Sequence, residues 1–328
     1  MPDANAREPE RWLRVLAALA IGIACGLISW WATIIPGFRD QDFAVWRMAA
    51  NAVLHGQSPY ATIVDPVGRP EFFYPLSTAL AFVPSLLVPL TIGGPLFAAM
   101  SCALLAYVVT AEAWWPLLMF LSGSMYASVV QAQLSPILTA AMLLPGLTWL
   151  GVLKPNIGLA MLARTPSWRS AAIMALIVGA TIPIMPNWPA AWVRTAANSP
   201  FHFAAWRAPG GFLLLLALLR WRLPEARLLA AMALVPTSPF VYEVLPLLLT
   251  ARSKIELAVL VVLSDLALLI VIGYSAQNDT SLMFPRARLS IAGLIYVPAL
   301  IMVLARRNQQ LPPEPTVEDA ARSCPTAV

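Results

Sequence analysis

Charged residues are scarce in this sequence. Lysine, arginine, aspartate and glutamate make up 11% of the 328 residues, whereas hydrophobic residues make up 59%. A soluble fold of this length could not bury so much apolar surface, so lipid has to solvate part of it. We therefore predict an all-α integral membrane protein that crosses the lipid bilayer many times.

Cysteine and histidine are rare as well. Of the three cysteines, Cys25 and Cys102 lie in apolar segments and Cys324 lies near the C-terminal end, so none has an evident disulfide partner. The sequence contains neither a Cys-x-x-Cys pair nor a His-rich motif. We therefore expect no redox centre, no metal and no cofactor.

Positive charge is spread over the ends of the apolar segments. The net charge is +5, but dispersed arginines do not follow a phosphate backbone, so no nucleic-acid partner is expected. The positive-inside rule assigns these clusters, and with them both termini, to the cytoplasmic side. The clusters are Arg7/Arg11/Arg14, Arg164/Arg169, Arg220/Arg222/Arg227, Arg252/Lys254 and Arg306/Arg307.

Apolar segments follow one another along most of the chain. The first, residues 15–35, has no ionisable group over 21 residues, about 32 Å as a helix, which matches a hydrocarbon core of ~30 Å. Because it is too long for a signal peptide, we expect it to be retained. The segments are residues 15–35, 75–90, 95–110, 114–129, 134–150, 151–163, 168–184, 211–219, 226–235, 240–250, 255–274 and 289–305. They predict about ten to twelve transmembrane helices in one domain, residues 1–305.

Two polar connections, residues 36–73 and 186–210, are longer than the others and are predicted to lie on the outer face. In the first, Phe43, Trp46, Ala50 and Val53 recur at helical spacing, which predicts a short interfacial helix that stops at Gly56. The second is also rich in tryptophan and arginine, which predicts another interfacial element. We predict that residues 306–328, which contain prolines and scattered acidic residues, form a disordered cytoplasmic tail.

Four short motifs in the first half of the chain point to one family. They are D-F-x-x-W-x-x-A-A-x-x-x-L-x-G-x-S-P-Y at residues 42–60, F-F-Y-P at residues 72–75, Q-A-Q-L-S-P at residues 131–136 and L-K-P at residues 153–155. In this order they resemble the bacterial family-87 glycosyltransferases of the GT-C superfamily. The chain departs from that pattern at Leu76, where the family usually has a second proline, and at Ala132, where glycine is common.

The resemblance implies a GT-C-like enzyme of the bacterial inner membrane whose active site faces the periplasm or the exterior. Such an enzyme transfers a sugar, typically mannose, from a polyprenyl monophosphate donor to a glycan or glycolipid acceptor and inverts the anomeric carbon. The alternatives are a lipid or solute transporter or flippase, for which isolated intramembrane charges are equally natural, and a noncatalytic membrane subunit.

Acidic residues at the start of the interfacial helix are the candidate general bases for the acceptor hydroxyl. Asp42 occupies the acidic position of the family, and Asp40 is its competitor. Either acid could instead serve only to stabilise a helix N-terminus. Farther along the chain, Asp265 is expected to pair internally.

Lys154 is the one ionisable residue between positions 137 and 163, where its burial in lipid would cost about 2.5–3.5 kcal/mol. We expect it to bind the donor phosphate together with Arg39 or Arg47; snorkelling to the interface is the alternative. The residues expected to orient donor or acceptor are Tyr60, Tyr74, Gln133, Tyr242 and Glu243. For the tyrosines, an interfacial aromatic belt is the alternative.

Overall fold

The computed structural model describes residues 7–35, 42–64, 71–198, 203–238, 240–275 and 280–306. Within these ranges the chain forms helices and no strand, apart from an isolated bridge between Phe203 and Thr237. Among the described residues, 4 helices are long and apolar enough to cross a membrane: Arg11–Ile34, Leu90–Val109, Lys254–Gly273 and Arg286–Leu304. The expectation of an all-α fold is confirmed for the described residues, and the four long apolar helices are compatible with a membrane protein.

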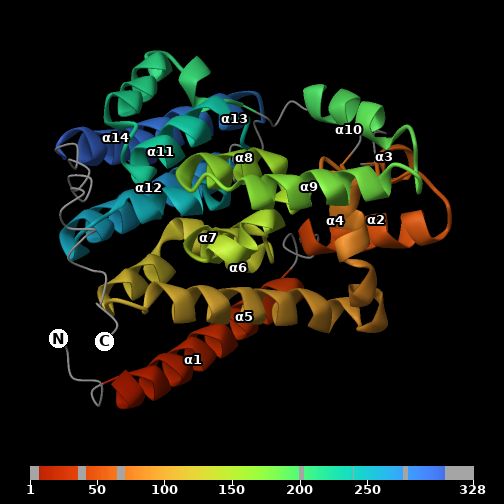
Figure 1. Ribbon diagram of the computed structural model, residues 1–328, viewed down its shortest axis with the longest axis horizontal. Coiled ribbons are helices and arrows are strands. Elements are labelled where there is room, and N and C mark those ends of the chain that lie inside the picture. Colours follow the sequence, from red (N-terminus) through yellow and green to blue (C-terminus); the bar gives the residue numbers. More distant parts are fainter. Residues whose placement is uncertain are drawn as a thin grey trace, which may run out of the picture.

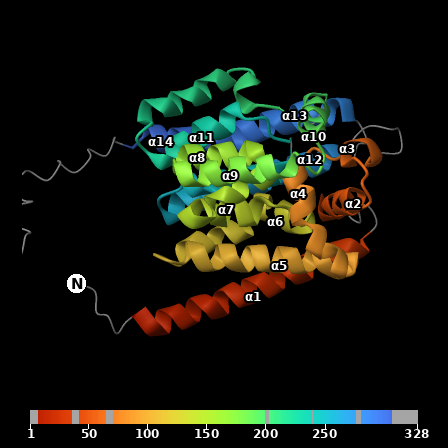
Figure 2. The same cartoon turned by 45° about the vertical axis from the view of Figure 1, so that its right-hand side comes forward.

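The long helices α1 (Arg7–Ile34) and α5 (Leu90–Val109) lie side by side along one flank of the molecule (Figures 1 and 2). They run antiparallel, since Gly22 faces Ala103 whereas Gly26 faces Ala99. A Cβ on Gly22 would lie 2.8 Å from the Ala103 Cβ, so only glycine permits this approach. The other face of α1 is apolar and exposed, as a lipid-facing helix requires.

The remaining elements are shorter. Before α5 lie α2 (Asp42–Leu54), α3 (Pro59–Thr62), α4 (Leu76–Ala81) and the 3-10 helix η2 (Val83–Leu87). After it come η3 (Trp115–Leu121), α6 (Gly123–Val130), α7 (Ser135–Leu143), η4 (Pro145–Leu153), α8 (Pro155–Arg164), α9 (Trp168–Thr181), α10 (Trp188–Ala197), η5 (Ala205–Arg207), η6 (Gly211–Arg220), α11 (Pro224–Leu234), η7 (Val241–Thr250), α12 (Lys254–Ser275), α13 (Thr280–Ile291), the π-helix η8 (Ala292–Tyr296) and α14 (Val297–Leu304).

A helix is present at the predicted place, as α2, and its position at the membrane interface stays a prediction. Its side chains Phe43, Trp46, Ala50 and Val53 are buried, as their spacing predicted. The helix ends in a Schellman motif, in which Gly56 has φ +69° and the Gln57 N–H reaches Ala52 O.

The prediction that residues 75–90 cross the membrane is wrong. Tyr74, just before this segment, bonds Asp42 at the start of α2. At its far end, the carbonyls of Ser85 and Val88 accept hydrogen bonds from Arg47 of the same helix. Because Asp42 and Arg47 are separated by less than two turns, about 8 Å, α4 and η2 form a hairpin that returns to the end of the molecule where it began.

The predicted single crossing over residues 134–150 is also wrong. The chain leaves Gln133, which lies beside Asp42, and α7 takes it to Leu143 and Leu144, which share a cavity with Arg14 of α1. The segment η4 then runs back to Lys154, beside Tyr74. Pro145 marks the reversal because its ring has no N–H to continue α7.

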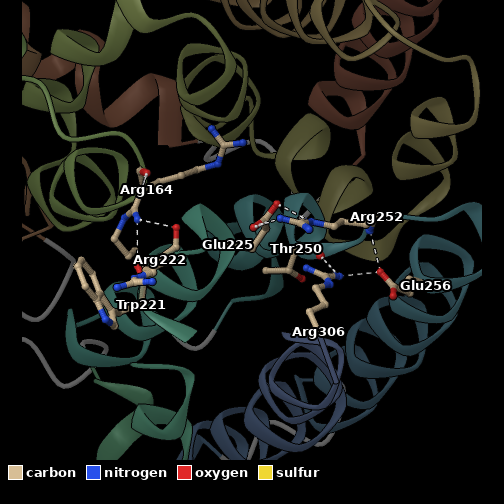
Figure 3. A network of polar contacts seen from close by, with 9 residues as sticks. Arg164, Trp221, Arg222, Glu225, Thr250, Arg252, Glu256 and Arg306 are labelled. Carbon is tan, nitrogen blue, oxygen red and sulfur yellow. Dashed lines mark hydrogen bonds and ion pairs between the residues drawn. The ribbon is translucent and has the colours of Figure 1, made fainter. Parts of the chain in front are cut away.

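Most of the predicted basic clusters meet at one end of the molecule. Figure 3 shows Arg252 paired with Glu225 and Arg306 paired with Glu256, at 3.0 and 2.7 Å. Other arginines bond backbone carbonyls at helix ends: Arg14 bonds Tyr107 O, Arg164 bonds Met142 O, Arg220 bonds Leu304 O, and Arg227 bonds Ala163 O and Arg164 O. These cations therefore satisfy carbonyls that helix termini leave without intrahelical partners.

The two predicted outer loops meet at the opposite end. There α2, α3, α4 and α10 lie together, on the right of Figure 1, whereas α1 begins on the left. The Trp192 indole of α10 donates a hydrogen bond of 2.9 Å to Phe73 O.

Between α6 and α12, Asp265 accepts a hydrogen bond from the Gly123 N–H, so it does pair internally. Apart from Arg306, the predicted tail lies outside the described residues.

The hairpin makes the topology testable. Leu87 is 89% exposed and lies at the end that carries His55, whereas a crossing over residues 75–90 would carry Leu87 toward Ser253. In a background without Cys25, Cys102 and Cys324, Leu87→Cys should react with a membrane-impermeant maleimide from the same side of oriented cells as His55→Cys. A Leu87→Cys protein that reacts only from the side of Ser253→Cys would contradict the hairpin.

Candidate active site

Lys154 lies at the break between η4 and α8. Pro155 is the first residue of α8, a position where proline is favoured because that N–H has no helical partner. The break leaves the last carbonyls of η4 without intrahelical donors, and two hydroxyls of α4 replace them. Ser77 Oγ donates to Val152 O at 3.1 Å, and Thr78 Oγ1 donates to Leu153 O at 2.6 Å. This anchorage fixes the backbone from which the lysine projects.

Lys154 forms a buried ion pair with Glu243 of η7. The ammonium Nζ lies 2.7 Å from Glu243 Oε1, and the two side chains are 6% and 4% exposed. The second carboxylate oxygen accepts a bond of 2.8 Å from the Ser238 N–H and lies 3.5 Å from Asn156 Nδ2. Lys154 therefore does not snorkel to the interface, because its charge is compensated inside the protein.

Asp42 receives hydrogen bonds from three distant parts of the chain. Gln133 Nε2 and the Tyr74 hydroxyl, the latter at 3.2 Å, both donate to its Oδ2. The Tyr242 hydroxyl lies 3.5 Å from the same oxygen. Residues that are up to 200 positions apart in the chain thus converge on one carboxylate.

Gln133 is positioned by the C-terminal cap of α6. The Ala132 N–H bonds Val129 O and the Gln133 N–H bonds Ser128 O, which together form a Schellman motif. In this motif Ala132 takes the left-handed conformation, with φ +46°, that normally favours glycine. The resemblance places glycine at this position, and the conformation gives a physical reason for that preference.

Aromatic rings enclose the charged groups. The Lys154 ammonium lies 5.6 Å from the centroid of the Tyr74 ring and 5.3 Å from that of Tyr242, within the range of cation–π attraction. Tyr60 does not touch Asp42; its hydroxyl donates to Tyr74 O at 3.0 Å and so supports the neighbouring ring. Trp46 packs edge-on against Tyr74 on the other side.

Burial raises the pKa of the Asp42 carboxyl above its ordinary value, because desolvation disfavours the charged form. The positive charge of Lys154 and the hydrogen bonds from Gln133 and Tyr74 oppose that increase in pKa, while the negative charge of Glu243 adds to it. Burial and the same two carboxylates raise the pKa of Tyr74, so its hydroxyl stays protonated and donates to Asp42. The carboxylate is thus a stronger proton acceptor than an ordinary aspartate.

The remaining predicted site residues are not part of this cluster in the described structure. Arg47 is not brought to Lys154; its guanidinium bonds the carbonyls of Ser85, Leu86 and Val88 and closes the α4–η2 hairpin. The candidates Asp40 and Arg39 lie outside the described residues.

Sequence reasoning missed two contributors, the Asn156 side chain and the Ser238 N–H, which both hold Glu243. Asn156 could have been noticed as a polar residue in the apolar stretch that contains Lys154. A backbone donor such as that of Ser238 leaves no signal in a sequence.

The described residues contain no group of three or more His, Cys, Asp and Glu side chains that could hold a metal ion. No protein-family model, curated protein or solved structure matches the chain. The arrangement itself therefore carries the functional argument: a desolvated carboxylate with hydrogen-bond donors, a buried ammonium and aromatic walls.

The buried ion pair should show strong energetic coupling. Lys154→Met leaves a buried carboxylate and Glu243→Gln a buried ammonium, so each should lower the free energy of unfolding by roughly 3–5 kcal/mol. The double variant removes both charges and should lose much less than the sum of the two. The check is a double-mutant cycle from denaturant unfolding in detergent. Additive losses would show that the two charges do not interact.

Proposed function

We propose that the protein is a membrane glycosyltransferase that transfers a sugar from a polyprenyl monophosphate to a glycan or glycolipid acceptor. The sugar is mannose, as is typical of the family that the sequence resembles. The observation that supports this most is the convergence of Asp42, Gln133 and Lys154, which belong to three separate motifs of the resemblance. These residues lie at the end of the molecule opposite the basic clusters, so the positive-inside rule directs the site to the periplasm or exterior.

In the proposed reaction, the acceptor hydroxyl oxygen attacks the anomeric carbon as the bond from that carbon to the phosphate oxygen breaks. The Asp42 carboxylate takes the hydroxyl proton, and the electron pair of the broken bond stays on the polyprenyl phosphate. Attack opposite the leaving phosphate inverts the anomeric carbon. The hydroxyl of Tyr74 and the amide of Gln133 hold the carboxylate in position for the proton.

Lys154 is the proposed ligand of the donor phosphate. Its charge is balanced by Glu243, so donor binding substitutes a phosphate oxygen for one carboxylate oxygen at the ammonium. Glu243, held by Ser238 and Asn156, then remains available to accept hydrogen bonds from sugar hydroxyls. Tyr74 and Tyr242 provide the faces against which a sugar ring packs.

A transporter or flippase is the second candidate, because a buried lysine–glutamate pair beside a desolvated aspartate is also suited to moving protons or charged solutes. The decisive measurement uses purified protein in detergent with a synthetic polyprenyl-phosphate mannose. Formation of a mannosylated acceptor supports the transferase. Uptake into proteoliposomes without transfer would support the transporter instead.

Asp42→Asn should lower the transfer turnover by on the order of 10²–10⁴-fold, because the amide keeps the shape of the side chain but cannot accept the proton. The variant should still fold, because the amide oxygen of asparagine can accept the hydrogen bonds from Gln133 and Tyr74 and a neutral side chain has no buried charge to desolvate. Turnover is measured with saturating donor, and folding by thermal unfolding of the same preparation.

Asp40→Asn is the matched control for that variant. Near-normal transfer by Asp42→Asn together with an inactive Asp40→Asn would move the base two residues upstream. Full activity in both variants would remove this loop from the chemistry.

The acid limb of the pH profile should lie above the pKa of an ordinary aspartate, about 3.9. The base works deprotonated and burial raises the pKa of Asp42, so transfer is lost as the pH falls through that raised value. Glu243→Gln removes a negative charge and should move the limb to lower pH, whereas Lys154→Met removes a positive charge and should move it to higher pH. Single-turnover rates against pH test both shifts; shifts in the reverse directions would exclude Asp42 as the titrating group.

A further inference from the structure

A cavity lies at the arginine end of the molecule, remote from Asp42. Its volume is about 470 Å³, which is within the usual range for small-molecule sites. Arg14 of α1 lines it, and about 30 Å of helix separates Arg14 from the end of α1 at Ile34. None of the residues placed in the candidate active site lines this cavity.

Most of the cavity wall is apolar. Residues from separate helices, among them Val108, Trp115, Leu144 and Leu249, form it. Such a wall accepts a hydrocarbon chain and gives a soluble polar metabolite few partners.

Three charged side chains line the same cavity: the guanidinium groups of Arg14 and Arg164 and the exposed carboxylate of Glu112. Arg14 donates through Nε and Nη2 to Thr110 and Tyr107, and Arg164 through Nη1 to Met142. Since a guanidinium carries five N–H donors, these bonds leave donors for a further oxygen ligand.

The cavity also receives the C-terminal ends of α5, α7 and η7. Helix C-termini carry partial negative charge, which opposes a purely anionic ligand and favours a cationic group. A ligand with both signs of charge satisfies the site better than one with either sign alone. Its phosphate contacts the guanidinium groups, and its ammonium contacts the Glu112 carboxylate.

We propose that this cavity binds a zwitterionic phospholipid with a primary ammonium group, of the phosphatidylethanolamine type. The phosphate binds Arg14 and Arg164, the ammonium binds Glu112, and one acyl chain lies against the apolar wall. The position at the basic end of the helix bundle places the headgroup at the membrane surface on that side. This inference does not depend on the glycosyltransferase proposal.

The test uses the full-length protein, delipidated in detergent and offered phosphatidylethanolamine, phosphatidylcholine or phosphatidylglycerol with identical acyl chains. Native mass spectrometry should find phosphatidylethanolamine retained about tenfold more tightly than the other two, since losing one charge-assisted contact has about that effect. A further arm offers inorganic phosphate alone, which should not bind. Equal retention of the three lipids, or binding of free phosphate, would overturn the proposal.

Variants separate the parts of the site. Glu112→Gln should abolish the preference for phosphatidylethanolamine over phosphatidylcholine without unfolding the protein, because Glu112 is exposed. Ala251→Phe fills the cavity and should reduce retention of all three lipids. Arg222→Gln, at the same end but outside the cavity wall, is the control and should change nothing. Unchanged retention in both cavity variants would contradict the assignment.

Discussion

The ion pair between Lys154 and Glu243 joins two parts of the chain that lie almost ninety positions apart. An ammonium buried alone would cost several kcal/mol, so the lysine at the start of α8 and the glutamate in η7 each require the other. Their pairing fixes the break between η4 and α8 against the first turn of η7. Around that fixed point, the hydroxyls of Ser77 and Thr78 orient α4, and Tyr74 then reaches Asp42.

The cations at the two ends of the molecule have different partners. At one end, arginines bind backbone carbonyls and acidic side chains in an extended network that holds helix ends together. At the other end, a single lysine serves the interior. Arg47 lies at the same end of the molecule as Lys154, but like the arginines of the opposite end it binds backbone carbonyls.

Composition and periodicity predicted the class of fold, the helix α2 and the presence of a single charged residue, Lys154, in an apolar segment. Each of these follows from local hydrophobicity. They did not reveal the α4–η2 hairpin, since an apolar segment that re-enters the membrane has the same composition as one that crosses it. The reversal at Leu144 was missed for a similar reason: three successive apolar helices look like two when a proline is the sole boundary. The partners of Asp42 came from motifs, but their convergence is a property of packing that no local pattern encodes.

Several helices of the described chain are shorter than the thickness of a bilayer. The 3-10 helices η6 and η7 have 10 residues each, about 20 Å at a rise of ~2.0 Å per residue, against a hydrocarbon core of ~30 Å. Nearly all of η7 is buried by its neighbours, so protein rather than lipid surrounds this short helix. Tyr242 and Glu243 lie in the first turn of η7, near one end of this short helix. These two polar side chains therefore lie at the end of a short buried helix and not at its middle.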